Sequence, residues 1–273
     1  MRKSGERPHF RVSGIGLLFF AASLLISGCQ KTVIVKISEE DIVRANAAAQ
    51  EGDIAYAKKD FYAALIKYLE SVRINPNSAY VYNRLGIAYS QLKYYQQAGD
   101  AFERSMKIDP KYSYSYNNFG TVFFAQKDFK KAEKYFKKAI SMKNNEASYH
   151  MNLGSVYLEK KKPEKAMAEW RKGLGIDPGI LSRNSSVAMV GGATSTMDRA
   201  FAMARIMASM GKIESTIENL KVAFANGYTD FDTIRKLPDF DPVRKDKRFT
   251  DLLEETELLL RLRKVGLPEA STK

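Results

Sequence analysis

The chain has 273 residues, of which 45% are hydrophobic, and this is enough apolar material for a sizeable buried core. A single cysteine excludes an internal disulfide, so stability has to come from apolar burial. The net charge of +13 would suggest a nucleic-acid partner if the chain were cytoplasmic. Signals for export are therefore considered first.

The first 28 residues have the three parts of a secretory signal peptide. Arg2, Lys3, Arg7 and Arg11 form a basic start, residues 12–28 carry no charge, and small residues end the run. The uncharged run, about 17 residues, is at the short limit for crossing a bilayer of about 30 Å. The sequence therefore predicts a signal peptide over 1–28, with an uncleaved membrane anchor as the alternative.

Ile26-Ser27-Gly28-Cys29 resembles the lipobox of bacterial lipoprotein precursors. The resemblance implies cleavage before Cys29 and acylation of this residue, and two or three acyl chains bind a membrane far more stably than one. It also implies that Gln30, where enteric inner-membrane lipoproteins have Asp, favours the outer membrane, facing the periplasm. Residues 29–44 are then expected to be a tether, and no nucleic-acid partner is expected. The alternative is a chance cysteine after an ordinary signal peptide.

Beyond the tether, the chain repeats every 34 residues. Three columns of residues share this period: Gly52, Gly86, Gly120 and Gly154; Ala64, Ala98, Ala132 and Ala166; and the aromatic residues Tyr68, Phe102, Phe136 and Trp170. Small residues let two helices approach closely, and the aromatic residue is expected to fill the space between neighbouring helix pairs. Asp60 and Asp128 are placed as helix N-caps, and Pro163 suits the first turn of a helix.

The segment "YNRLGIAYSQLKYYQQAGDAFERSMKIDP" resembles the tetratricopeptide repeat almost position by position. The resemblance covers residues 45–178 and implies an all-α fold, a right-handed α-solenoid of antiparallel helix pairs. It divides this part into four regular repeats, 45–78, 79–112, 113–146 and 147–180. Such arrays bind other proteins through the concave groove that the first helix of every repeat lines.

The period breaks after Pro178. Residues 181–196 are rich in Ser, Gly and Thr and are expected to be a loop insertion. Residues 197–228 are predicted to form a degenerate fifth repeat, with Thr216 and Leu220 in the alanine and aromatic columns. Its Met203, Met207 and Met210 favour core packing, with an adaptable binding face as the alternative.

The last part of the chain is predicted to cover the end of the array. Residues 229–264 are expected to form a C-terminal cap, because a solenoid has to hide its last apolar face. Its apolar stripe at helical spacing consists of Phe249, Leu252, Leu253, Leu259 and Leu260. Residues 265–273 are expected to be a tail.

No group of residues suggests catalysis. His9 belongs to the predicted signal peptide, and His150 shares a helix-packing column with Tyr82 and Tyr116, so it is expected to be structural. The sequence has no metalloprotease, serine-hydrolase, phosphate-loop or Cys-x-x-Cys motif. We therefore expect no enzyme, no catalytic residue, no cofactor and no metal site.

Two surfaces could bind a partner. The groove face is predicted to present Tyr80, Asn83, Ile87, Tyr114, Asn117, Phe124, Met151 and Leu158, which suit an extended peptide or a partner helix. The Asn118 and Asn152 series is common to the repeat family and carries little information about a partner. Ile87, Thr121 and Ser155 replace the asparagines of a carboxylate clamp, which disfavours a co-chaperone. The second surface is a convex basic one, Lys130, Lys134, Lys137, Lys138 and Lys161, for which simple solubility is the alternative.

The sequence thus predicts a membrane-anchored adaptor of the bacterial cell envelope that binds an envelope protein or peptide segment in its groove. Two alternatives stay open: a cell-wall hydrolase or its regulatory subunit, and a tether that binds anionic wall polymer through the convex lysines. The oligomeric state, the pathway and the identity of the partner are left open.

Overall fold

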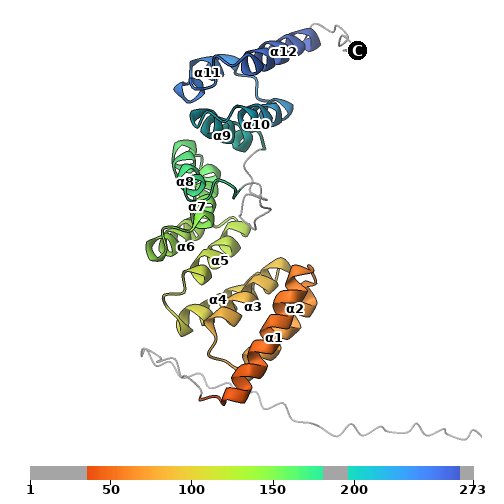
Figure 1. The fold of residues 1–273 in the computed structure, drawn as a ribbon, viewed down its shortest axis with the longest axis vertical. Coiled ribbons are helices and arrows are strands. Elements are labelled where there is room, and N and C mark those ends of the chain that lie inside the picture. The colour runs from red at the N-terminus through yellow and green to blue at the C-terminus, as the bar shows by residue number, and fades with distance from the viewer. Residues whose placement is uncertain (1–35, 181–195, 265–273) are drawn as a thin grey trace, which may run out of the picture. The chain divides into compact units, whose positions relative to one another are not determined.

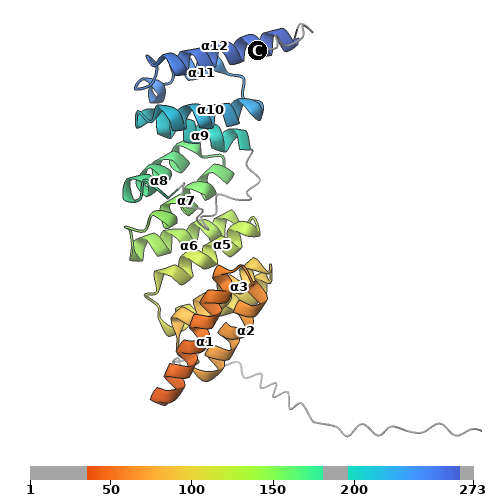
Figure 2. The same ribbon diagram turned by 45° about the vertical axis from the view of Figure 1, so that its right-hand side comes forward.

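The computed structural model describes residues 36–180 and 196–264, and all regular secondary structure in these ranges is helical. Consecutive helices form antiparallel pairs that follow one another along the chain (Figures 1 and 2). The five pairs are α1 (Glu39–Ala57) with α2 (Phe61–Ile74), α3 (Ala79–Gln91) with α4 (Tyr95–Ile108), α5 (Ser113–Ala125) with α6 (Phe129–Met142), α7 (Ala147–Glu159) with α8 (Pro163–Ile176), and α9 (Thr196–Ser209) with α10 (Ile213–Ala225). The predicted all-α fold of stacked helix pairs is confirmed.

Three of the predicted helix starts have residues that suit a helix N-terminus. Asp60 accepts a hydrogen bond from the backbone N–H of Ala63, and Asp128 accepts one from Lys131, both at 3.0 Å, as predicted for N-caps. Pro163 is the first residue of α8, which was also predicted.

The first helix starts earlier than the sequence analysis expected. Ser38 Oγ accepts from the backbone N–H of Asp41 at 3.1 Å, and three acidic residues occupy the first turn of α1. Helix α1 therefore begins at Glu39, inside the range 29–44 that was assigned to a tether, and that boundary is corrected. Residues 29–35 of the tether, together with Cys29 and the signal peptide, lie outside the described residues.

A glycine of the first helix packs against an aromatic ring of the second in each of the four regular pairs. A Cβ atom added to Gly86 would lie 2.6 Å from the ring of Phe102, and one added to Gly120 would lie 2.7 Å from Phe136. The same contact joins Gly52 to Tyr68 and Gly154 to Trp170. All four rings are fully buried. The glycine leaves room for the ring inside its own pair, and the ring also reaches the next pair, as predicted: the ring centroids of Phe102 and Phe119 lie 6.1 Å apart.

The turns inside the pairs share one unusual backbone conformation. Lys59, Lys93, Lys127 and Lys161 have φ between 57° and 63°, in the left-handed region. Gly211 occupies the same place in the fifth pair, with φ 68°. This region disfavours residues with a Cβ atom by roughly 1–2 kcal/mol, so only the fifth pair has the residue that the turn prefers.

The fifth pair packs on the fourth through α9. Ala202, Met203, Ile206 and Met207 belong to the same core cluster as Trp170 of α8. Met203 and Met207 are therefore core residues, while Met210 is partly exposed. Thr216 and Leu220 are fully buried, as expected from their columns. The predicted loop 181–196 lies outside the described residues except for Thr196, where α9 begins.

The C-terminal part covers the fifth pair. It consists of α11 (Phe231–Lys236), the short 3-10 helix η1 (Pro238–Phe240) and α12 (Lys247–Lys264). Phe249 and Leu253 of α12 join a core cluster with Ala204 and Ala208 of α9. Leu259, predicted to share the buried stripe, is exposed instead. Leu252 and Leu260 of the predicted stripe pack against the same cluster, and the predicted tail 265–273 lies outside the described residues.

No helix in the described ranges is both long enough and apolar enough to cross a membrane. Within the same residues, no three His, Cys, Asp or Glu side chains are grouped so that they could hold a metal ion.

Candidate functional site: an amide-lined groove

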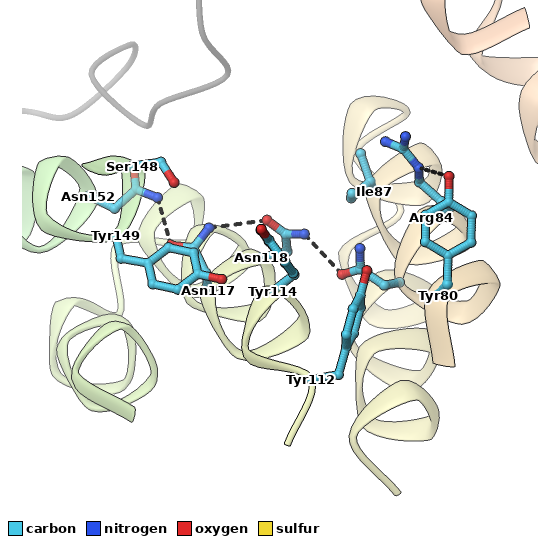
Figure 3. Close-up of a pocket in the computed structure, with 11 residues that line it drawn as sticks. Tyr80, Arg84, Ile87, Tyr112, Tyr114, Asn117, Asn118, Ser148, Tyr149 and Asn152 are labelled. Atoms are coloured by element: carbon cyan, nitrogen blue, oxygen red, sulfur yellow. Dashed lines mark hydrogen bonds between the residues drawn. The ribbon is translucent and has the colours of Figure 1, made fainter. Parts of the chain in front are cut away.

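A hollow of about 450 Å³ lies across the first helices of the second, third and fourth pairs (Figure 3). Helices α3, α5 and α7 supply nearly all of its lining, and Tyr112 comes from the connection before α5. The lining residues are Tyr80, Asn83, Arg84, Ile87, Tyr112, Tyr114, Asn117, Asn118, Ser148, Tyr149 and Asn152. The hollow combines aromatic faces with amide groups, which suits a polar chain with some apolar side chains.

The structure brings five of the eight predicted groove residues together in this hollow: Tyr80, Asn83, Ile87, Tyr114 and Asn117. The other three are core residues and are corrected here. Phe124 packs against Phe129 with ring centroids 5.5 Å apart, Met151 is fully buried near Gly173 of α8, and Leu158 is 5% exposed. Phe124 and Met151 thus face the second helices of their pairs, whereas Leu158 lines a separate hollow that it shares with Phe201 and Ala202 of α9.

A continuous chain of side-chain amides forms the floor of the groove (Figure 3). Asn152 Nδ2 donates to Asn117 Oδ1 at 2.9 Å, and Asn117 Nδ2 donates to Asn118 Oδ1 at 3.2 Å. Asn118 Nδ2 then donates to Asn83 Oδ1 at 2.9 Å. The chain therefore runs through three helix pairs and fixes the orientation of each amide in it.

Asn118 has the capacity to bind a partner as well. A primary amide has two N–H donors and two acceptor lone pairs, and the chain uses one donor and one acceptor position of Asn118. Its side chain is half-buried, whereas Asn83, Asn117 and Asn152 are buried. Asn118 is thus the member of the chain that is placed best to meet the backbone of a bound segment.

Sequence reasoning missed Asn118 and Asn152, although their spacing contained a usable signal. Asn83 and Asn117 are 34 residues apart, as are Asn118 and Asn152, and the two series are offset by one residue. An amide of one series can therefore bond to an amide of the other series on the preceding helix. The structure shows such bonds from Asn118 to Asn83 and from Asn152 to Asn117, and Asn117 bonds to Asn118 within α5. As a feature common to the repeat family, the series gives no expectation about a partner, and the bonds between its amides appear only in the structure.

One end of the groove carries a fixed tyrosine. Tyr80 donates its hydroxyl to Asp53 Oδ2 at 2.5 Å and accepts from Arg84 Nε at 3.0 Å. Arg84 also forms an ion pair with Asp53 at 3.0 Å. Burial, followed by the hydrogen bond to Asp53, raises the pKa of Tyr80, so its hydroxyl stays protonated at neutral pH.

Tyr114, one repeat later, has an equivalent set of partners. Lys143 Nζ donates to the Tyr114 hydroxyl at 2.6 Å and pairs with Glu146 at 2.9 Å. The Tyr114 hydroxyl donates to the same carboxylate at 3.2 Å. The hydrogen bonds to Tyr114 and Glu146 raise the pKa of Lys143. Both tyrosines thus stand beside one cation and one carboxylate, so the rim carries balanced charge and favours an uncharged polar segment.

The predicted convex lysines have different surroundings. Lys130, Lys134 and Lys138 are exposed on α6, and Lys134 Nζ lies 6.0 Å from the centre of the Tyr135 ring. Lys137 Nζ pairs with Glu133 at 2.6 Å, and Lys161 Nζ lies 3.8 Å from Asp198. Ion pairing reduces the charge that Lys137 and Lys161 would offer to an anionic surface.

His150 links α7 to its neighbours. Its ring is 5% exposed, with Nδ1 2.7 Å from Glu169 Oε2 and Nε2 3.0 Å from the carbonyl oxygen of Asn144. Both ring nitrogens are engaged inside the array, which is the structural role that the packing column predicted.

Comparison with known proteins identifies tetratricopeptide repeats in this chain. The tetratricopeptide repeat family matches residues 78–145 and, in a second form, residues 117–179. The match includes the helices α3, α5 and α7 that line the groove. No curated protein sequence matches the chain.

Solved structures share the fold at low sequence identity. The Pseudomonas aeruginosa protein pilF is 17% identical with a TM-score of 0.54, covering 83% of this chain and 94% of its own. TTC0263, a thermophilic tetratricopeptide repeat protein of Thermus thermophilus, is 18% identical with a TM-score of 0.50, covering 69% of this chain and 94% of its own. These structures support the solenoid fold, and the tetratricopeptide repeats found by the family matches are typical of protein-interaction scaffolds.

Proposed function

We propose that the chain is a lipid-anchored adaptor of the bacterial cell envelope, and that its groove binds an extended segment of another envelope protein. The observation that supports the groove best is the amide chain Asn152–Asn117–Asn118–Asn83. Extended peptides expose backbone N–H and C=O groups in a regular row, and a row of oriented amides can bond both kinds of group. Tyr80 and Tyr114, held by their own hydrogen bonds, offer apolar faces at fixed positions.

The lipid anchor rests on the resemblance of residues 26–29 to a lipobox, and the proposed place of action is the outer membrane, facing the periplasm. Acylated Cys29 would hold the adaptor at the membrane, so that it recruits its partner there. Changing Cys29 to Ser should leave an unprocessed or soluble form. If this variant matures and fractionates with membranes as the parent does, the anchor is excluded.

Photo-crosslinking in cells tests the groove. A photoreactive phenylalanine analogue replaces Ser148, which lines the groove, or Lys134, which is exposed on α6. A discrete protein adduct is expected from position 148 and not from position 134. Adducts from position 134 alone would instead favour contact through the convex lysines. The segment identified in the adduct then serves as the ligand for titrations.

The wall-polymer tether remains the competing proposal, because Lys130, Lys134 and Lys138 are exposed on one helix. Binding to purified cell wall that weakens steeply with salt, and that is lost on replacing these lysines with alanine, would favour it. The groove proposal expects these replacements to leave capture of the crosslinked protein unchanged.

A further inference from the structure

Helix α2 presents apolar side chains to solvent along its outer face. Tyr62 is 60% exposed, Ile66 is 63% exposed and Leu69 is 41% exposed. Their spacing of four and three residues places them on one side of the helix, which is labelled in Figures 1 and 2. We refer to these three residues as the α2 stripe.

The same positions are polar in the next two repeats of this chain. One period after the α2 stripe, α4 has Gln96, Asp100 and Glu103, and after another period α6 has Lys130, Lys134 and Lys137. The outward face of a second helix normally meets water and needs no apolar residue. The first repeat therefore has apolar residues at positions where packing within the array does not require them, and the next two repeats have polar ones.

Tyrosine and lysine side chains surround the α2 stripe. Tyr94 is 42% exposed, and it lies close enough to Tyr62 to raise the pKa of the Tyr62 hydroxyl. A shallow hollow of about 320 Å³ lies between Ile66, Leu69, Glu70 and Arg73. Lys58, Lys59 and Lys93 lie in the turns next to the tyrosine end. Tyrosine and basic side chains around an apolar centre are the composition that proteins place at a membrane–water interface.

The chain connectivity places this face within reach of the proposed anchor. Ser71 Oγ of α2 donates to the carbonyl oxygen of Ala45 at 2.7 Å, so the end of α2 that carries Leu69 lies beside the first turns of α1. Glu39 follows Cys29 by ten positions in the sequence. A chain of this length spans at most about 35 Å.

We propose that the α2 stripe rests on the surface of the bilayer that holds the lipid of Cys29. This inference depends on the lipid anchor of the proposed function. The three residues of the α2 stripe and Tyr94 are few against the roughly 20–30 residues on each side of a stable protein interface. An anchored protein, by contrast, needs only a small apolar contact, because the lipid supplies most of the membrane affinity. The contact would orient the array and set the direction of its groove.

The test uses the single cysteine of the chain. Once Cys29 is acylated, Ile66→Cys introduces the only free thiol, at an exposed position that imposes no packing change. Asp100→Cys, at the equivalent position one repeat later, is the matched control. Each full-length lipidated variant is labelled with an environment-sensitive nitrobenzoxadiazole dye and reconstituted in phosphatidylethanolamine–phosphatidylglycerol vesicles with nitroxide-labelled lipid.

We expect the dye at position 66 to shift to the blue and to be quenched by the nitroxide lipid at least threefold more than the dye at position 100. Equal weak quenching at both positions would overturn the proposal. Shielding of position 66 from aqueous iodide without nitroxide quenching would also overturn it, in favour of a protein partner. Disulfide-linked dimers of Ile66→Cys would overturn it in favour of a second copy of the chain.

Measurements on the parent protein separate absence of the lipid anchor from absence of the membrane contact of α2. If the thiol of Cys29 reacts with maleimide and the parent does not float with the vesicles, the lipid anchor is absent and both proposals fall. If the parent floats and its thiol is blocked, but position 66 is not quenched, only the membrane contact of α2 is wrong.

Discussion

The four regular helix pairs and the fifth pair are packed by different residues in equivalent positions. Gly154 faces Trp170 in the fourth pair, and 50 positions later the fifth pair has Ala204 and Leu220. Both are fully buried. An extra carbon atom on the first helix thus accompanies a smaller side chain on the second. The difference indicates that the contact between the two helices depends on the summed volume of the two facing residues, and not on a glycine alone.

The groove changes at the same boundary. With the same offset of 50 residues, Asp198 corresponds to Ser148 and Ala202 corresponds to Asn152. The amide chain joins the second, third and fourth pairs, whereas the hollow of about 380 Å³ beside the fifth pair is lined by Phe201, Ala202 and Arg205 among others. The proposed binding surface is therefore confined to the second, third and fourth pairs.

The largest expected effect concerns the glycine–aromatic contact. Gly120→Ala should lower the free energy of unfolding by about 2 kcal/mol, because the new Cβ atom would lie 2.7 Å from the Phe136 ring in a packed core. Gly175→Ala, where no atom lies within 4 Å, should instead raise it by about 0.5–1 kcal/mol through helix propensity. Urea unfolding measures both, and equal effects at the two sites would contradict the packing that the structure shows.

A double variant sharpens the comparison between the two kinds of pair. Phe136→Leu alone should cost about 1–3 kcal/mol through the space it leaves. Combined with Gly120→Ala it reproduces the alanine–leucine arrangement of Ala204 and Leu220. The double variant should therefore lose at least about 1 kcal/mol less than the sum of the single losses. Strict additivity would show that the combined volume is irrelevant.

The second expected effect concerns binding. Tyr114→Ala should weaken binding of the crosslinked segment about thirtyfold, which corresponds to about 2 kcal/mol at about 1.4 kcal/mol per decade. Asp198→Ala, at the groove position of the fifth pair, should change the dissociation constant less than twofold. Calorimetric titration checks both, and a larger loss from Asp198→Ala would move the binding surface to the fifth pair.

Much of the packing could be predicted from the sequence, whereas the groove could be predicted only in part. The 34-residue columns place Gly120 and Phe136 correctly because packing repeats with the chain. The amide chain depends on bonds such as Asn118 to Asn83, which join residues 35 positions apart in different pairs. A linear pattern shows that both residues are polar, and only the approach of the helices shows that they bond.

The errors have local physical causes. The sequence analysis places Phe124 and Leu158 on the groove face of their helices, but both lie near the helix ends, are only 5% exposed and do not line the hollow that holds the amides. The start of α1 was readable, since Ser38 is followed by three acidic residues, which is a strong N-terminal helix signal. It was missed because the repeat period was used to set the boundary.

The third effect compares the junctions on either side of the fourth pair. Glu133 of α6 accepts from Lys137 and from Lys160 at the end of α7, each at 2.6 Å. Burial opposes its charge, but these hydrogen bonds lower the pKa of Glu133 to about 2 from 4.5. The stabilisation is thus complete above pH 4.5 and is lost as the pH falls toward 2.

Glu133→Gln should cost about 1 kcal/mol of unfolding free energy at pH 6 and much less at pH 3. Glu164, which pairs with Arg205 at the next junction, is 71% exposed and is the control. Glu164→Gln should change stability by less than about 0.5 kcal/mol at either pH. A Glu133→Gln loss of equal size at both pH values would show that the ion pairs are not its source.

The smallest effect concerns the turns. Lys127→Gly should raise the unfolding free energy by about 0.5 kcal/mol, because glycine adopts the φ of 62° without strain but gains more freedom on unfolding. Gly211→Lys in the fifth pair should lower it by a similar amount. Thermal unfolding of the two variants compares them, and a loss from Lys127→Gly would show that the lysine side chain has a stabilising role in its turn.

The binding of an extended segment by the amide chain is tested most directly at Asn118. In Asn118→Leu, Asn83 keeps its contact with Ser115, and Asn117 keeps its bond from Asn152, so the floor of the groove retains partners. Titration of the crosslinked segment at two salt concentrations should show about tenfold weaker binding to Asn118→Leu, equal at both concentrations, and unchanged binding to Lys134→Ala. If only Lys134→Ala weakens binding, and does so more at low salt, the groove is not the binding surface.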